Sequence, residues 1–236
     1  MLIAELSAIE PRIPEMECRI FPSSFNPKDT DLRAFPRAIH WRWTSCERML
    51  RFFGAQAVMT RVPNFWQLES LVHACCRNIG APLFTNEPEN LALGAAAIVS
   101  ANVNAIISEA SETAPFVSFL LERDVPLPAL WLLIHKADAR EWSVPPSLIQ
   151  NGITVAQEVH LFPGVPILHQ CPALASDKKP LFHVSDEYEW EMLESETLIT
   201  SAGGDPLPLH RLLLPISIHA AGECACGKTI VQKRTV

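Results

Sequence analysis

The sequence is short of glycine. It contains 9 glycines and 20 prolines in 236 residues, and the first glycine is Gly54. Glycine-rich loops bind phosphate because residues without a side chain let several backbone N–H groups approach the anion. The first 53 residues contain no glycine and therefore cannot form such a loop. Proline removes a hydrogen-bond donor and restricts the residue before it, so many rigid connections and few flexible loops are expected.

The sequence also has no excess of basic residues, no long apolar run and no basic segment at its start. The net charge of −7 argues against a nucleic-acid partner, whose phosphates require a basic face. No apolar run reaches the roughly 18 residues that a membrane span needs, so no membrane partner is expected. The N-terminus carries Glu5, Glu10, Glu15 and Glu17 without a basic segment, and we expect no secretory signal.

What remains is the composition of a globular protein. Hydrophobic residues make up 48% and charged residues 19% of the chain, whose length suits one large domain or two small ones. The seven cysteines are an odd number and include the adjacent pair Cys75 and Cys76. This usage is typical of reduced thiols, so the protein is expected to be cytoplasmic.

The hydrophobic pattern divides the chain into three parts. Residues 1–40 are expected to be irregular, because prolines interrupt every periodic run. Residues 41–164 alternate short apolar runs with helical patterns, which predicts βαβ crossovers and a parallel sheet. Residues 165–236 contain short strand patterns only, which predicts a small antiparallel β subdomain. The predicted fold class is therefore α/β.

Several boundaries in the middle part can be predicted from capping signals. A Thr44-Ser45-Cys46-Glu47 capping box begins a helix that ends at Gly54, and Asn64, with Gln67, begins another that ends at Gly80. Further on we expect a helix at 88–93 that ends at Gly94 and a helix at 103–122 that is interrupted near Pro115. Short strands are expected at 57–60 and 82–84, buried strands at 95–99 and 129–134, and a last strand at 154–160.

A metal site is predicted near the end of the chain. Cys224-Ala225-Cys226-Gly227 forms a C-x-C-G knuckle, in which Gly227 lets the backbone fold back so that two thiolates face the same way. Two more soft ligands would complete the tetrahedral N/S shell of structural zinc. Cys171 and His183 are candidates for these ligands, with His169 and His219 competing for the fourth position.

The order of these elements, the Cys171…His183 segment, the run Leu207-Pro208-Leu209-His210-Arg211 and the knuckle resemble the large domain of the adenylate-forming ligases. The phenylacetate–CoA ligase-like branch is the most similar part of that family, and the resemblance covers roughly residues 18–234. It implies activation of a carboxylate by ATP and transfer of the acyl group to CoA. It also implies that zinc is held by Cys171, His183, Cys224 and Cys226, which favours His183 over His169.

The catalytic motifs of the family do not carry over. Ser23 and Ser24 occupy the place of the phosphate loop, followed by Pro27 instead of glycines. The phosphate- and magnesium-binding Thr/Glu pair should fall near 157–163, where Glu158 is out of register. The ribose-binding aspartate that should follow Arg211 is replaced by apolar residues and proline. The chain also ends just past the knuckle, so we expect the mobile C-terminal domain with its lysine to be missing.

These departures predict a non-catalytic, degenerate relative of AMP-forming acyl-CoA ligases that acts as a zinc-stabilised binding or scaffold protein. We assign no catalytic residue, and Ser23, Ser24 and Arg211 are the candidate cofactor contacts. Zinc is expected as a structural cofactor, whereas ATP, AMP and CoA are not. A protein partner, a small acyl ligand and a second copy of the chain stay open as partners. The alternative is a minimal or split AMP-forming ligase for an acyl or aryl acid.

Overall fold

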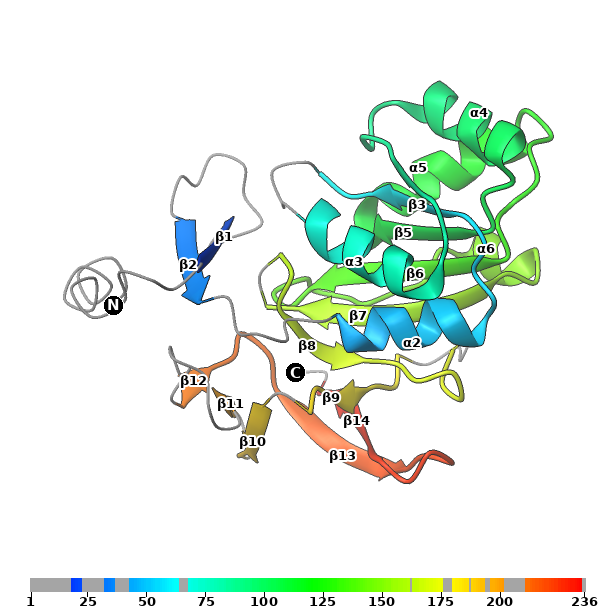
Figure 1. The fold of residues 1–236 in the computed structure, drawn as a ribbon. Coiled ribbons are helices and arrows are strands. Elements are labelled where there is room, and N and C mark those ends of the chain that lie inside the picture. The colour runs from blue at the N-terminus through cyan, green and yellow to red at the C-terminus, as the bar shows by residue number, and fades with distance from the viewer. Residues whose placement is uncertain are drawn as a thin grey trace.

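The computed structural model describes residues 18–22, 32–36, 43–63, 68–161, 163–175, 180–186, 188–193, 196–201 and 211–234. Its centre is a seven-stranded sheet with the strand order β4-β3-β5-β6-β7-β8-β9 (Figure 1). The strands are β3 (Val58–Arg61), β4 (Leu83–Thr85), β5 (Ala105–Glu109), β6 (Leu130–Lys136), β7 (Thr154–His160), β8 (Pro166–His169) and β9 (His183–Val184).

The sheet is parallel over most of its width. Strands β4, β3, β5, β6 and β7 pair in parallel, as the alternation of strands and helices predicts. The last two strands reverse direction, because β8 runs antiparallel to β7 and β9 antiparallel to β8. Although β8 and β9 come from the part of the chain after residue 165, they therefore extend the edge of the main sheet.

Helices cover both faces of the sheet (Figure 1). On one face lie α2 (Thr44–Phe52) and α3 (Glu69–Ile79), and on the other α4 (Leu91–Ala101), α5 (Ala110–Leu121) and α6 (Pro146–Gln150). Successive strand residues point to opposite faces. Ile107 and Leu132 accordingly pack with the α2 and α3 side chains, and their neighbours Ile106 and Leu133 with those of α4 to α6. The central strands β5 and β6 are buried on both faces, and each begins with an unbroken apolar run.

Small antiparallel sheets complete the described structure and confirm the predicted change of architecture. A three-stranded sheet contains β10 (Tyr188–Met192), β11 (Thr197–Ser201) and β12 (Leu212–Leu213), and a hairpin contains β13 (Ile218–Glu223) and β14 (Thr229–Lys233). A further antiparallel pair, β1 (Cys18–Pro22) and β2 (Leu32–Pro36), lies in the proline-rich first part. Residues 1–40 are therefore not entirely irregular, although both strands have only five residues.

Two of the predicted elements are wrong. The segment 95–99 is not a strand but the middle of α4, which runs from Leu91 to Ala101 through Gly94. The expected long helix at 103–122 is instead strand β5 followed by α5, and Pro115 lies inside α5. Both errors concern short apolar runs, for which periodicity alone does not distinguish a buried strand from a buried helix.

The helix ends agree with the predictions in part. Gly80 is the left-handed C-cap of α3, as predicted. The N-cap of α2 is Trp43 rather than Thr44, and its side chain makes no capping hydrogen bond. The predicted cap residues Asn64 and Gln67 lie outside the described residues.

Gly94 is required for close packing and not for ending a helix. A Cβ atom at this position would lie 2.7 Å from Arg61 Nη1, 2.7 Å from Asn86 Nδ2 and 3.0 Å from Phe116 Cζ. The guanidinium of Arg61 stacks 3.6 Å above the ring of Phe116 and donates to the carbonyl oxygen of Pro88 at 2.6 Å. The missing side chain of Gly94 therefore makes room for a buried arginine at the end of β3.

Candidate functional site

The turn between β13 and β14 is the predicted knuckle. The N–H of Cys224 donates to the carbonyl oxygen of Lys228 at 2.9 Å, and the N–H of Gly227 donates back to the carbonyl oxygen of Cys224 at 2.8 Å. Gly227 has φ +81°, a left-handed conformation that side chains disfavour. This turn holds Cys224 and Cys226 at the tip of the hairpin.

The structure brings the four predicted metal ligands together. Cys171 Sγ lies 3.6 Å from Cys224 Sγ, and His183 Nε2 lies 3.3 Å from Cys171 Sγ and 3.4 Å from Cys226 Sγ. All four ligand atoms lie within 4.8 Å of one another. With bonds of about 2.3 Å to sulfur and 2.0 Å to nitrogen, a tetrahedral zinc shell separates two sulfurs by about 3.8 Å and a sulfur from a nitrogen by about 3.5 Å. The observed separations fit that shell.

The ring of His183 is already oriented for a metal. Its Nδ1 lies 2.8 Å from the backbone carbonyl oxygen of Thr229. A carbonyl can only accept, so Nδ1 carries the proton and Nε2 offers its lone pair to the centre. Such hydrogen bonds commonly fix the tautomer of metal-binding histidines. Thr229 begins β14, so the same hairpin that carries the cysteines also orients the histidine.

Burial distinguishes the four ligands from one another. Cys171, His183 and Cys224 are buried and Cys226 is exposed. Burial raises the pKa of the Cys171 thiol to about 11, with a further contribution from Cys224. Burial also tends to raise the pKa of Cys226, but hydrogen bonds, first from the backbone of Lys228, outweigh it and lower that pKa. A bound cation stabilises thiolates, so this donor set is suited to a metal that replaces the thiol protons.

The remaining candidate residues lie elsewhere. The described residues place His169 beside the centre, its ring 5.9 Å from that of His183, but neither His169 nor His219 belongs to the ligand group. Arg211 is exposed, has φ +48° and pairs with Glu191 at 3.1 Å. Ser23 and Ser24 lie outside the described residues.

A second cluster of polar side chains occupies the carboxyl end of β7. Glu158 Oε2 accepts from the indole N–H of Trp43 at 2.5 Å and lies 3.1 Å from His160 Nε2. Glu158 is 1% and His160 0% exposed, and the ring of Trp43 lies edge-on against that of His160. This group, Trp43, Glu158 and His160, is called the strand-end cluster below.

Polar side chains near the carboxyl ends of the neighbouring strands also contact one another. Lys136 at the end of β6 forms an ion pair of 2.6 Å with Glu109 at the end of β5. His135 Nε2 lies 2.9 Å from Gln157 Oε1, and both side chains are buried. Burial lowers the pKa of His135 to about 4, so its ring is neutral at pH 7. The sequence does not predict these contacts. The residues share no local motif and meet only because their strands are neighbours in the sheet.

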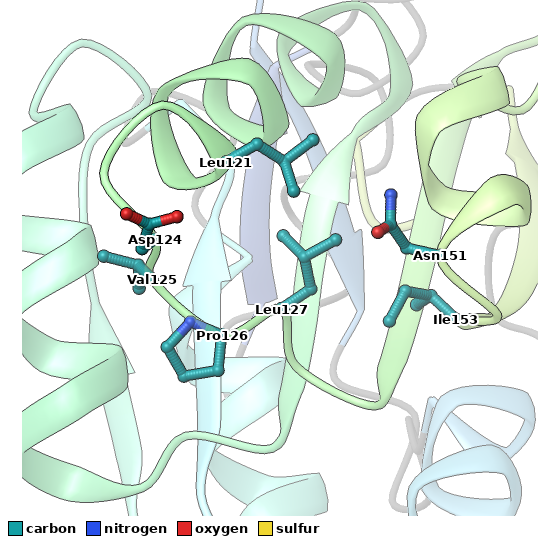
Figure 2. Close-up of a pocket in the computed structure, with 7 residues that line it drawn as sticks. All are labelled: Leu121, Asp124, Val125, Pro126, Leu127, Asn151 and Ile153. Atoms are coloured by element: carbon teal, nitrogen blue, oxygen red, sulfur yellow. The ribbon is translucent and has the colours of Figure 1, made fainter.

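Two of the pockets in the described part of the chain flank the sheet. One of about 190 Å³ lies at the start of α2 and is lined by Thr44, Ser45, Arg48, Pro166, His169, Ser185 and Asp186. The other, of about 360 Å³, is shown in Figure 2 and lies where β6 and β7 begin. Leu121, Leu127 and Ile153 are among the apolar residues that line this second pocket, and Asp124 and Asn151 are its polar lining residues. Open α/β sheets bind ligands at the carboxyl ends of their strands, and this pocket lies at the opposite end.

Comparison with known proteins identifies the fold. No protein-family model and no curated protein matches the sequence. Among solved structures, an open conformation of 2-hydroxyisobutyryl-CoA ligase with 2-HIB-AMP and CoA matches at a TM-score of 0.67 and 13% identity, over 94% of this chain and 56% of that one. The chain has the fold of the acyl- and aryl-CoA ligases of the adenylate-forming family.

Other CoA ligases match over similar portions. The anthranilate CoA ligase with anthranoyl-AMP has a TM-score of 0.58 at 11% identity, over 91% of this chain and 46% of that chain. The o-succinylbenzoate coenzyme A synthetase of Bacillus subtilis with AMP has a TM-score of 0.54 at 12% identity, over 91% of this chain and 49% of that chain. The chain thus spans about half the length of these ligases. None of the described helices is long and apolar enough to cross a membrane.

Proposed function

We propose that this protein is a non-catalytic relative of the AMP-forming CoA ligases that acts as a zinc-stabilised binding or scaffold protein. The observation that carries this proposal is the strand-end cluster. In an open α/β sheet the ligand enters the crevice at the carboxyl ends of the strands. Here Glu158 and His160 at that edge are 1% and 0% exposed and hydrogen-bond to each other.

The partners of Glu158 support this proposal. A carboxylate that serves phosphate or magnesium must be open to its ligand, because Mg²⁺ binds directly to carboxylate oxygens and substrate phosphates. Glu158 instead uses Oε2 for Trp43 and His160, and Trp43 is itself 3% exposed. At the next strand end the ammonium of Lys136 is paired with Glu109. These groups are engaged with one another rather than presented to a nucleotide.

The metal centre supports a structural role in the same protein. Four protein ligands complete a tetrahedral zinc shell and leave no position for a substrate. The centre joins the segment at Cys171, strand β9 at His183 and the β13–β14 hairpin at Cys224 and Cys226. We infer that zinc fastens the end of the chain to the edge of the main sheet, where a binding partner would find a rigid surface.

The alternative is a split or minimal AMP-forming ligase, and the shared fold is the observation in its favour. Since the chain spans about half the length of the matched ligases, a separate polypeptide could supply the remaining part. In that case Arg211 would be released from Glu191 to contact the nucleotide, because the ion pair between them is solvent-exposed and weak.

ATP–pyrophosphate exchange with a panel of acyl and aryl carboxylates tests the two functions. We expect no exchange above background and no ATP binding by calorimetry. A 2-hydroxyisobutyryl-CoA ligase assayed in parallel serves as the positive control. Exchange with any acid that disappears in Arg211→Ala but persists in Arg51→Ala, a distant exposed arginine, would overturn the non-catalytic proposal and establish the ligase.

A further inference from the structure

The pocket at the start of α2 combines features that favour a negatively charged ligand. The first N–H groups of a helix have no partner within the helix and carry a partial positive charge. The N-cap of α2 is Trp43, whose side chain makes no capping hydrogen bond. Thr44 and Ser45, the first two residues of this nine-residue helix, line the pocket. The helix therefore presents its positive end to the cavity.

Arg48 adds a full positive charge one turn into the same helix. Its side chain is exposed and lines the pocket, and among the described residues no carboxylate forms an ion pair with it. Arg51, one turn further along, is by contrast paired with Glu47 at 3.0 Å. A planar guanidinium with several N–H donors suits the paired oxygens of a phosphate or carboxylate.

His169, which lines the same pocket, supplies an independent observation. The residue is only 6% exposed, and it lines the pocket from β8. Within the described part of the chain, neither ring nitrogen of His169 has a hydrogen-bond partner. Its ring makes a T-shaped contact with the ring of His183. A buried polar group normally finds a partner. His169 lines this pocket, so a ligand bound there can supply that partner.

The remaining charges leave the pocket positive. Asp186 also lines it, but its carboxylate is paired with the ammonium of Lys228. That hydrogen bond lowers the pKa of Asp186, and Arg48 contributes in the same direction. The Asp186 and Lys228 charges offset each other, so Arg48 and the helix end set the sign.

Size limits the kind of ligand. At about 30 Å³ for each water molecule, a pocket of about 190 Å³ holds roughly six waters. That is below the range of about 300–1,000 Å³ typical of sites for drug-sized molecules. This volume matches a tetrahedral oxyanion with a short organic group better than a whole nucleotide.

We propose that this pocket binds a small oxyanion, either phosphate or the phosphoryl group of a compact phosphate monoester, between the first turn of α2, Arg48 and His169. The proposal goes beyond the function proposed above, because it needs neither catalysis nor a scaffold partner. The N–H groups of the first turn, the guanidinium and one ring N–H donate to the oxyanion. The bound ligand would connect α2 with β8, next to the metal centre.

The test is a titration of the full, metal-loaded chain, with inorganic phosphate in one arm and glycerol 3-phosphate in the other. Calorimetry gives the affinity, and NMR follows the amides of Ser45 and Cys46. We expect one saturable site and shifts of the first-turn amides. Tighter binding of glycerol 3-phosphate assigns a monoester, and equal or tighter binding of phosphate assigns the free ion. The absence of saturable binding in both arms would overturn the proposal.

Three variants locate the site. Removing one charge-assisted hydrogen bond typically weakens binding roughly ten- to a hundredfold, so we expect that loss for Arg48→Gln. The matched control Arg51→Gln removes an arginine from the same helix outside the pocket and should bind as the parent does. Asp186→Asn removes the negative lining charge and should tighten binding. Equal weakening by both arginine variants, or weaker binding by Asp186→Asn, would contradict an oxyanion at this site.

Discussion

Nδ1 of His183 lies 2.8 Å from the carbonyl oxygen of Thr229, which joins strand β9 to the first residue of β14 through a side chain. A second link runs along the backbone, where Phe182 and Val231 exchange hydrogen bonds of 3.0 and 2.8 Å. The hairpin is thus attached to the sheet edge before any metal is considered. A bound metal would strengthen an existing attachment.

The first prediction concerns the exposed ligand Cys226. In small zinc modules the metal contributes on the order of 10–16 kcal/mol to folding, but a protein with a separate apolar core depends on it less. Cys226→Ser should therefore lose stoichiometric zinc and increase amide exchange in β13 and β14, while β5 to β7 keep their protection. Elemental analysis and hydrogen exchange measure both effects.

The control for Cys226→Ser is Glu223→Gln, which changes an exposed residue of the same hairpin that is not a metal ligand. This variant should keep the metal. Protein purified without chelator that contains no stoichiometric metal would contradict the zinc centre altogether.

The second prediction separates the two neighbouring histidines. His183→Gln should lose metal, because no other described imidazole belongs to the ligand group. His169→Gln should retain it, although its ring lies only 5.9 Å from that of His183. Zinc content after dialysis against a weak chelator distinguishes the variants, and retention by His183→Gln would show that the ligand set is wrong.

The third prediction concerns acid stability. Burial lowers the pKa of His135 from 6.5 to about 4 in the folded protein. Between these values the unfolded chain binds the proton and the folded chain does not, so stability falls as the pH falls from 6.5 to 4. The contribution of His135 is on the order of 3 kcal/mol over this window.

Urea unfolding between pH 7 and pH 4 measures this dependence. His135→Gln should reduce the slope by up to about 1.4 kcal/mol per pH unit. His73→Gln, which replaces an exposed histidine of α3, is the control and should leave the slope unchanged. An unchanged slope in His135→Gln would mean that His135 is not neutral and buried.

The fourth prediction concerns Gly94. Alanine is favoured over glycine in a helix interior by about 1 kcal/mol. At this position, however, the added Cβ would lie 2.7 Å from Arg61 Nη1, and Arg61 is held by Phe116 and Pro88. We expect Gly94→Ala to lower the free energy of unfolding by about 1–2 kcal/mol, since overpacking typically costs 1–3 kcal/mol.

Ser100→Ala, on the exposed side of α4, provides the comparison. It adds an alanine without a close contact and should be neutral or slightly stabilising in thermal unfolding. Greater stability of Gly94→Ala would show that Arg61 and Asn86 move aside freely.

The fifth prediction compares two buried indoles. Trp43 donates to the carboxylate of Glu158, whereas Trp142 donates to the backbone carbonyl of Lys136 at 3.1 Å. Hydrogen bonds to charged groups contribute about 1.5–3 kcal/mol and neutral ones about 0.5–1.5 kcal/mol. Trp43→Phe should therefore destabilise the protein more than Trp142→Phe in urea unfolding. The reverse order would show that the hydrogen bond to Glu158 contributes less than the one to the Lys136 carbonyl.

Local sequence patterns predicted the parallel core and most of the Cys/His cluster. The knuckle consists of four consecutive residues, and Gly80 ends α3 at the position that the helical pattern predicts. The choice of His183 depended on the family resemblance, because spacing alone left His169 and His219 open. Strand β14 was not predicted, and it contributes the carbonyl of Thr229 that orients His183.

Contacts between distant residues could not be predicted from patterns. Trp43 and Glu158 are separated by 115 positions, and no periodicity relates them. The sequence pattern predicts a helix end at Gly94, because its packing against Arg61 and Phe116 depends on the tertiary structure and leaves no local signal. The alanine-rich run after it is apolar enough for a strand, but alanine strongly favours helix, and that propensity decides the structure of α4.

The two-residue strand β9 determines where this protein is most prone to aggregate. It lies at the open border of the seven-stranded sheet, where unpaired backbone groups are a template for strands of other molecules. The hairpin fastened through His183 shields that border. Without zinc, the hairpin would be held at this border by hydrogen bonds such as those of His183 with Thr229 and of Phe182 with Val231. Self-association, with rising light scattering at an unchanged helical signal, should therefore be detected before the core unfolds.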